Sequence, residues 1–145
     1  MSDKFFIDTN ILVYSFDNAN PTKCSIARRV IEQALTDNNG VISYQVVQEF
    51  LNVATRKFVM PLCVEDAKAY LNRVLEPLCE VYASMELYEH ALDISQRWQY
   101  SFYDALIIAA AVRSGCSRLY SEDLQHGQKI QQLEIFNPFV SVTQR

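Results

Sequence analysis

Short apolar runs rich in β-forming residues alternate with longer amphipathic segments along the chain. The predicted strands are KFFID (4–8), VIS (41–43), CEVY (79–82), RLYS (118–121) and LEIFN (133–137). Apolar residues at three- and four-residue spacing predict helices over 20–37, 44–58, 64–75, 84–98 and 101–115. Strands that alternate with helices pair in parallel through crossover connections. The sequence therefore predicts a three-layer α/β/α sandwich with a central parallel sheet of four or five strands.

The boundaries of these segments follow common turn signals. The triplet NNG (38–40) ends the first helix, Gly115 ends the last one, and Pro77 stops the helix over 64–75. No repeat, low-complexity tract or linker interrupts the 145 residues. We therefore expect one domain over 1–145, with ligands bound at the carboxyl ends of its parallel strands.

Hydrophobicity and cysteine usage indicate a soluble cytoplasmic protein. Half of the residues are hydrophobic, which is enough for a core without disulfides or a structural metal. The four cysteines form no Cys-x-x-Cys pair and have no histidine at zinc-finger spacing, which indicates reduced thiols. We expect no signal peptide and no membrane span, because the longest apolar stretch, ALIIAAAV, is far too short to cross a bilayer.

Two acidic residues stand at or near places where a buried strand gives way to a helix. Asp8 follows the apolar run FFI, and its ordinary explanation is a helix N-cap. Glu49 lies in a predicted helix between Val46 and Val53, and no Lys or Arg stands three or four residues away. A carboxylate beside an apolar face needs a partner, and a metal ion is one such partner. The alternative is a partly exposed surface glutamate.

Two further acids occupy comparable places. Asp104 opens the strongly apolar helix over 101–115, where a capping box with Ser101 is the ordinary alternative. Asp123 follows a predicted strand, where a turn is the ordinary alternative and Glu122 is an alternative ligand. In a parallel sheet, all four acids would lie at the edge that the carboxyl ends of the strands form. Clustered carboxylates repel one another, and Mg²⁺ or Mn²⁺ would remove that repulsion.

The charge balance is compatible with this metal site. The net charge is −4, from 13 basic and 17 acidic residues, whereas general nucleic-acid binders are usually basic. If four acids are metal ligands, the remaining acids and bases balance. The acidic composition then no longer argues against a nucleic-acid substrate.

Four segments also resemble a known family. FIDTNILVY, SYQVVQEFLNV, SFYDALIIAAA and LYSEDLQHG resemble, in order and spacing, the signature segments of PIN-domain proteins. The resemblance covers nearly the whole chain, and within the family the length is similar to that of VapC-type toxins of toxin–antitoxin modules. It implies an Mg²⁺-dependent (or Mn²⁺-dependent) endoribonuclease that acts on RNA, with a small inhibitory antitoxin and a homodimeric state. The implied metal ligands and catalytic acids are Asp8, Glu49, Asp104 and Asp123, with Ser121 and Asn10 ordering the site.

Two other functions remain open on the sequence. A haloacid-dehalogenase-like phosphatase also begins with a strand that ends in Asp, but it requires a second acid two residues later, where this chain has Asn10. The other alternative is a non-catalytic RNA- or protein-binding module in which the acids serve only as caps. Binding of Mg²⁺ would distinguish the nuclease from the binding module.

Overall fold

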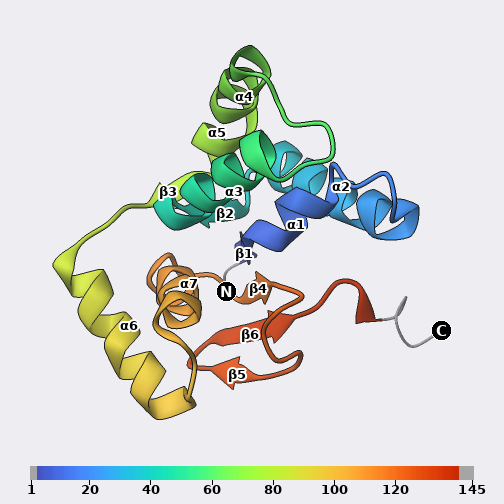
Figure 1. Ribbon diagram of the computed structural model, residues 1–145. Coiled ribbons are helices and arrows are strands. Elements are labelled where there is room, and N and C mark those ends of the chain that lie inside the picture. Colours follow the sequence, from blue (N-terminus) through green and yellow to red (C-terminus); the bar gives the residue numbers. More distant parts are fainter. Residues whose placement is uncertain (1–2, 141–145) are drawn as a thin grey trace.

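A six-stranded sheet forms the centre of the computed structural model, which describes residues 3–140 (Figure 1). The strands are β1 (Phe5–Ile7), β2 (Gly40–Ser43), β3 (Cys79–Val81), β4 (Arg118–Tyr120), β5 (Lys129–Ile130) and β6 (Leu133–Phe136). Their spatial order is β3-β2-β1-β4-β6-β5, and every neighbouring pair is parallel except β5 with β6. The predicted parallel sheet of four or five strands is confirmed, with five strands in parallel. The two-residue edge strand β5 was not predicted.

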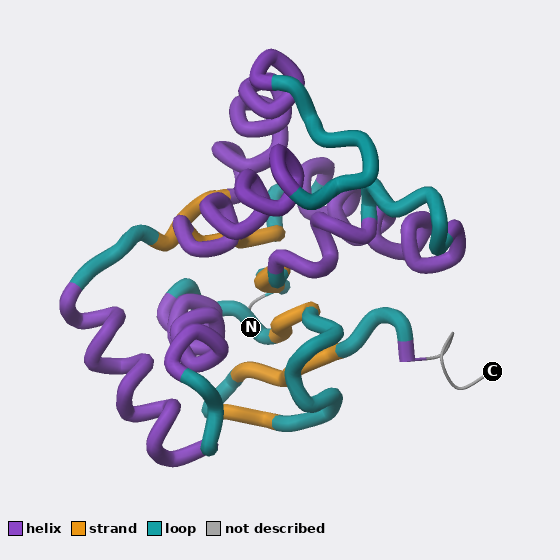
Figure 2. Tube along the Cα trace, in the orientation of Figure 1, coloured by secondary structure: helices purple, strands orange, loops and turns teal. Residues whose placement is uncertain are grey.

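Helices cover both faces of the sheet. They are α1 (Thr9–Tyr14), α2 (Pro21–Thr36), α3 (Tyr44–Arg56), α4 (Val64–Tyr70), the π-helical turn η1 (Leu71–Leu75), α5 (Glu76–Leu78), α6 (Met85–Trp98) and α7 (Phe102–Arg113). In Figure 1, α6 and α7 pack together on the left of the sheet, whereas α1 and α2 lie to its right. Figure 2 shows the extended connection that carries the chain from β3 to α6. The predicted three-layer arrangement is confirmed.

The core lies between the sheet and these helices. The strand residues Phe6, Ile7 and Ile42 are fully buried, as a parallel sheet with two covered faces requires. Every residue from Ala105 to Ala111 is buried, so α7 is the central helix that its all-round apolar sequence predicts. All four cysteines are free, as expected. No helix within residues 3–140 combines the length and the apolar character needed to cross a bilayer.

The prediction that Pro77 stops a helix was wrong. The helix continues from α4 through η1 into α5, and Pro77 lies in the first turn of α5. The Glu76 N–H donates to the Leu71 carbonyl, five residues back, which is the π pattern. Because proline has no N–H, Pro77 cannot donate to a carbonyl of the preceding turn, and it lies directly after the π-helical turn, where the helical register changes. The helix passes through Pro77 and ends one residue later, at Leu78.

The turn NNG (38–40) ends α2 as predicted, but its residues have different roles from those expected. Asn38 adopts the left-handed conformation (φ 54°), whereas Gly40 is the first residue of β2. Gly40 is required by space, because a Cβ at this position would lie 2.2 Å from the Cβ of Ala34 in α2. The glycine therefore allows the close approach of α2 to β2.

Candidate active site

Asp8 lies at the junction of β1 and α1 and is 8 % exposed. Its Oδ1 accepts a hydrogen bond from the Thr9 N–H (2.7 Å), which makes Asp8 the N-cap of α1. Its Oδ2 accepts from the Ser121 hydroxyl (2.8 Å), which follows β4. The N-cap interpretation is therefore correct, but it accounts for only one of the two carboxylate oxygens.

The surroundings of Asp8 raise its pKa from 3.8 to about 6. Burial is the main cause, because the charged carboxylate loses its hydration. The hydrogen bonds from Ser121 and Thr9 lower the pKa, and the negative charges of Glu49 and Asp123 raise it. A cation close to Asp8 would favour the ionised form and offset the effect of burial.

Glu49 lies on the second turn of α3 and is half-buried. Its Oε1 accepts a hydrogen bond from the Thr9 hydroxyl (2.7 Å), and its Oε2 accepts from the Gln45 amide (3.3 Å). Thr9 therefore connects two of the predicted acids, with its N–H bound to Asp8 and its hydroxyl bound to Glu49.

Asp123 lies in the loop after β4 and is held by the two predicted supporting residues. Its Oδ2 accepts from the Asn10 amide (3.1 Å), and its N–H donates to the Ser121 hydroxyl oxygen (3.2 Å). Ser121 is fully buried and also lies 3.5 Å from the Asn10 amide. Ser121 and Asn10 therefore form a polar connection between Asp8 and Asp123.

The neighbouring acid, Glu122, has a different role. Its Oε1 accepts from the Tyr14 hydroxyl (2.7 Å), and its Oε2 forms a salt bridge with Lys23 (2.6 Å). Its N–H donates to the side-chain oxygen of Asn10 (3.3 Å). The Glu122 carboxylate is thus occupied by Tyr14 and Lys23, and Asp123 is the better candidate for a ligand at this edge.

Asp104 lies at the start of α7, where its N–H donates to the Ser101 hydroxyl oxygen (3.3 Å). The helix-cap interpretation of this segment is correct. Within residues 3–140, no hydrogen bond or ion pair joins the Asp104 side chain to the other three acids. An indirect connection exists, because the Gln45 amide that contacts Glu49 also donates to the carbonyl of Tyr103 (3.2 Å). Asp104 therefore follows a residue that is tied to the site.

Two polar residues of the site, Thr9 and Gln45, were not singled out from the sequence. Gln45 is buried, stands four residues before Glu49 and bridges α3 to α7. Thr9 directly follows Asp8. Their signals in the sequence are only this adjacency and the i, i+4 spacing on a helix. Such spacings are common, so they do not mark these residues without knowledge of the fold.

The acids fit a hard divalent cation in charge and donor type. Carboxylate oxygens are the ligands that Mg²⁺ and Mn²⁺ prefer, and the charges of Glu49 and Asp123 contribute to the raised pKa of Asp8. Two buried oxygens at the carboxyl end of β2, Ser43 Oγ and Gln45 Oε1, lack hydrogen-bond partners in the described part of the chain, a feature common at functional sites. However, no three Asp, Glu, His or Cys side chains within residues 3–140 are already arranged around a metal position. The convergence of all four predicted acids on one metal stays a prediction.

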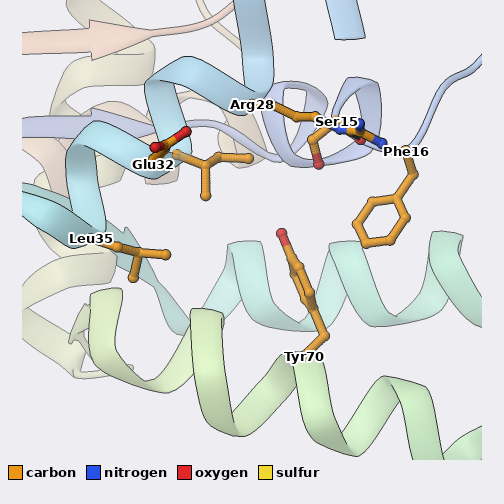
Figure 3. A pocket seen from close by; sticks show the side chains of 7 residues that line it. Ser15, Phe16, Arg28, Glu32, Leu35 and Tyr70 are labelled. Carbon is orange, nitrogen blue, oxygen red and sulfur yellow. Dashed lines mark hydrogen bonds between the residues drawn. The ribbon is translucent and has the colours of Figure 1, made fainter. Parts of the chain in front are cut away.

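A groove of about 530 Å³ leads to this group of acids. It lies between α1, α3 and the loop after β4, and its lining includes Glu49, Asp123, Thr9, Asn10 and Lys57. A second cavity, of about 330 Å³, lies between α2 and α4 (Figure 3). There the hydroxyl of Tyr70 points toward Ser15, and none of the four predicted acids lines the cavity. The groove beside Glu49 and Asp123 is therefore the candidate active site.

A comparison with models of protein families identifies the family to which this chain belongs. The family model described as "PIN domain" matches residues 5–129. The chain belongs to the PIN domain family. The resemblance carried by the four sequence segments is thus confirmed, and the PIN domain matched here spans all four predicted acids.

Two solved structures with the same fold are described as a toxin or as a complex that contains one. A toxin–antitoxin complex from Klebsiella pneumoniae includes a chain that is 18 % identical, with a TM-score of 0.64 over 93 % of this PIN domain protein and 98 % of that chain. VapC20 from Mycobacterium tuberculosis, described as a toxin that cleaves the sarcin–ricin loop, is 22 % identical, with a TM-score of 0.60 over 83 % of this chain and 90 % of VapC20. A comparison with curated protein sequences gave no match. At these identities the structures establish a common fold.

Proposed function

We propose that this PIN domain protein is a metal-dependent endoribonuclease and the toxin of a toxin–antitoxin pair. The observation that carries the proposal is the buried Asp8 carboxylate, which Thr9, Ser121 and Asn10 connect to Glu49 and Asp123 at one edge of the sheet. The family membership and the two toxin structures of the same fold support it. Asp8, Glu49, Asp123 and Asp104 would hold Mg²⁺ or Mn²⁺.

The chemistry explains why acids alone are insufficient. An RNA phosphodiester is negatively charged, so bare carboxylates would repel it. When bound, a divalent cation supplies the positive charge that lowers the pKa of a water molecule and stabilises the leaving oxygen. The protein's own contribution is orientation, because the N–H of Thr9 and the hydroxyl of Ser121 fix both oxygens of Asp8. The Thr9 hydroxyl and the Gln45 amide do the same for Glu49.

The two alternative functions are less well supported. A haloacid-dehalogenase-like phosphatase would use an acid at position 10, whereas Asn10 here donates a hydrogen bond to Asp123. A binding module without catalysis would have no reason to bury Asp8 at a raised pKa beside two other acids.

Cleavage of RNA tests the proposal directly. The purified protein should cut single-stranded RNA in the presence of Mg²⁺ or Mn²⁺, and EDTA should stop the reaction because it removes the cation that the acids hold. Gel analysis of the fragments, with a control of equal ionic strength in NaCl, measures this. Undiminished cutting in EDTA would rule out the metal-dependent mechanism.

The proposal also includes a homodimer, a small inhibitory antitoxin and a cytoplasmic location. Exposed apolar side chains such as Val59, Met60 and Met85 offer contact area for protein partners. Light scattering at micromolar concentration should give the mass of a dimer, and addition of the antitoxin should raise it. A monomer under these conditions would count against the dimer.

A further inference from the structure

The acid groove contains one carboxylate that the candidate metal site does not include. Glu122 lines the groove together with Glu49 and Asp123, and it directly precedes Asp123 in the chain. A hard divalent cation prefers carboxylate oxygens and does not by itself distinguish Asp from Glu. The choice between these two neighbouring carboxylates therefore depends on the groups that hold each of them.

The Glu122 carboxylate is held by two side chains, Tyr14 of α1 and Lys23 of α2, which we call the clamp. The Tyr14 hydroxyl donates to Oε1 (2.7 Å), and the Lys23 ammonium donates to Oε2 (2.6 Å). The Lys23 Nζ also lies 3.5 Å from the Tyr14 hydroxyl oxygen. Both oxygens of Glu122 are thus engaged. By contrast, only Oδ2 of Asp123 accepts a hydrogen bond, from Asn10, among the residues that the structure describes.

Aromatic rings fix the position of the Lys23 ammonium. Its Nζ lies 4.9 Å from the centroid of the Tyr14 ring and 5.5 Å from the centroid of the Phe139 ring. The two rings meet edge to face, with centroids 5.1 Å apart, and Phe139 is fully buried. An ammonium over aromatic faces gains a favourable cation–π interaction. The clamp is therefore a packed arrangement of side chains and not a loose surface ion pair.

The local structure of α2 does not account for a lysine at position 23. Lys23 is the third residue of α2, where the positive end of the helix macrodipole disfavours a cation. No acidic residue stands three or four positions away along the chain. The side chains of Lys23 and Glu122 are each only 22 % exposed, so the pair also loses hydration. What Lys23 gains is its contact with Glu122, 99 positions away in the sequence.

We infer that Lys23 and Tyr14 are positioning residues that keep the Glu122 carboxylate away from the cation, so that Asp123 is the ligand at this edge. The inference rests on the proposed metal-dependent nuclease function and explains how one of two adjacent acids is selected. Without the clamp, Glu122 would add a carboxylate without a counter-ion to a groove already lined by Glu49 and Asp123. This carboxylate would attract the cation, draw it away from Asp123 and repel the phosphates of RNA.

Binding of Mn²⁺ and cleavage of RNA should therefore change in opposite directions when the clamp is removed. In the double variant Tyr14→Phe/Lys23→Met, the side chains still fill their space, but neither holds Glu122. Its dissociation constant for Mn²⁺, measured by titration calorimetry, should fall about 3- to 10-fold because one more charged ligand is available. Its rate of RNA cleavage should fall about 10- to 100-fold, the usual effect of losing a group that orients a metal ligand. A merely structural role would weaken both.

Reversal by a third substitution and a matched control complete the test. Adding Glu122→Gln to the double variant removes the released charge, so the Mn²⁺ affinity should return to that of the unmodified protein and most of the cleavage should recover. Lys23→Arg should retain both properties, because a guanidinium can bind the same carboxylate. The control is Lys4→Met, which removes a cation from the exposed ion pair with Glu80 and should change neither property.

Two outcomes would overturn the inference. The first is an Mn²⁺ affinity of the double variant that is unchanged or weaker. The second is a loss of cleavage that Glu122→Gln does not reverse. If circular dichroism shows that the double variant is unfolded, Lys23→Met alone is judged by the same two criteria.

The test also separates the clamp from the proposed nuclease function. A protein that binds Mn²⁺ without cutting RNA would refute the nuclease, and the change in Mn²⁺ affinity would still decide the role of the clamp. Absence of Mn²⁺ binding by the unmodified protein would overturn both.

Discussion

Replacement of Asp8 by asparagine should reduce RNA cleavage more than about a hundredfold and leave the protein folded. Residues that only support a metal ligand typically contribute 10- to 100-fold to metal affinity or activity, so loss of a ligand itself should have a larger effect. Asparagine is isosteric, and its side-chain oxygen can still accept the Thr9 N–H that caps α1. The initial rate of cleavage at saturating Mn²⁺, together with circular dichroism, measures the two parts of this prediction.

The matched control for this substitution is Glu80→Gln. Glu80 forms an exposed ion pair with Lys4 (3.0 Å), and the same loss of one negative charge there should leave cleavage nearly unchanged. If Asp8→Asn cleaves within about threefold of the unmodified protein, Asp8 serves only as the N-cap of α1.

In the absence of metal, Asp8→Asn should be more stable than the unmodified protein at neutral pH. The pKa of Asp8 is about 6 in the folded state and 3.8 in its ordinary environment, so the folded state binds this proton more tightly. The corresponding stabilisation is fully present below pH 4 and is lost as the pH rises through 6, which amounts to about 3 kcal/mol. Asparagine does not titrate, so the difference between the two proteins should grow over this window. Urea unfolding in EDTA from pH 4 to 7.5 measures it.

Metal should largely cancel this difference. A cation that binds only the folded protein stabilises it by about 2.7 kcal/mol at a hundredfold excess over its dissociation constant. Mn²⁺ should therefore raise the free energy of unfolding of the unmodified protein and have little effect on Asp8→Asn. Equal gains in both proteins would remove Asp8 from the metal site, and an equal gain from NaCl of the same ionic strength would indicate general screening.

The sheet and the larger helices were predictable because their signals are local. The apolar runs before Asp8 and Asp123 and the all-round apolar sequence of α7 each lie within one segment. Short elements were not predictable in this way. The six residues of α1 and the two of β5 are too short to show a period of their own and form only because neighbouring elements support them.

The candidate site was predictable only in part, for a similar reason. Parallel topology indicates that the acids face one edge, but not how their side chains are held. Thr9 contacts Glu49 across 40 positions of sequence, and Ser121 contacts Asp8 across 113. The same limit applies to the choice between Glu122 and Asp123, which depends on Lys23 in α2. Such contacts follow from tertiary packing and leave no local pattern.

The direct join of β1 to α1 at Asp8 limits how such a site can change during evolution. Only Asp8 separates the last strand residue, Ile7, from the first helical residue, Thr9. The register of β1 in the sheet therefore fixes the position of the Asp8 carboxylate. An inserted or deleted residue here would shift either the buried strand or the cap, so length variation is excluded at this junction. Changes in the shape of the groove are therefore confined to the segments around the fixed carboxylate, such as α1, α3 and the loop after β4.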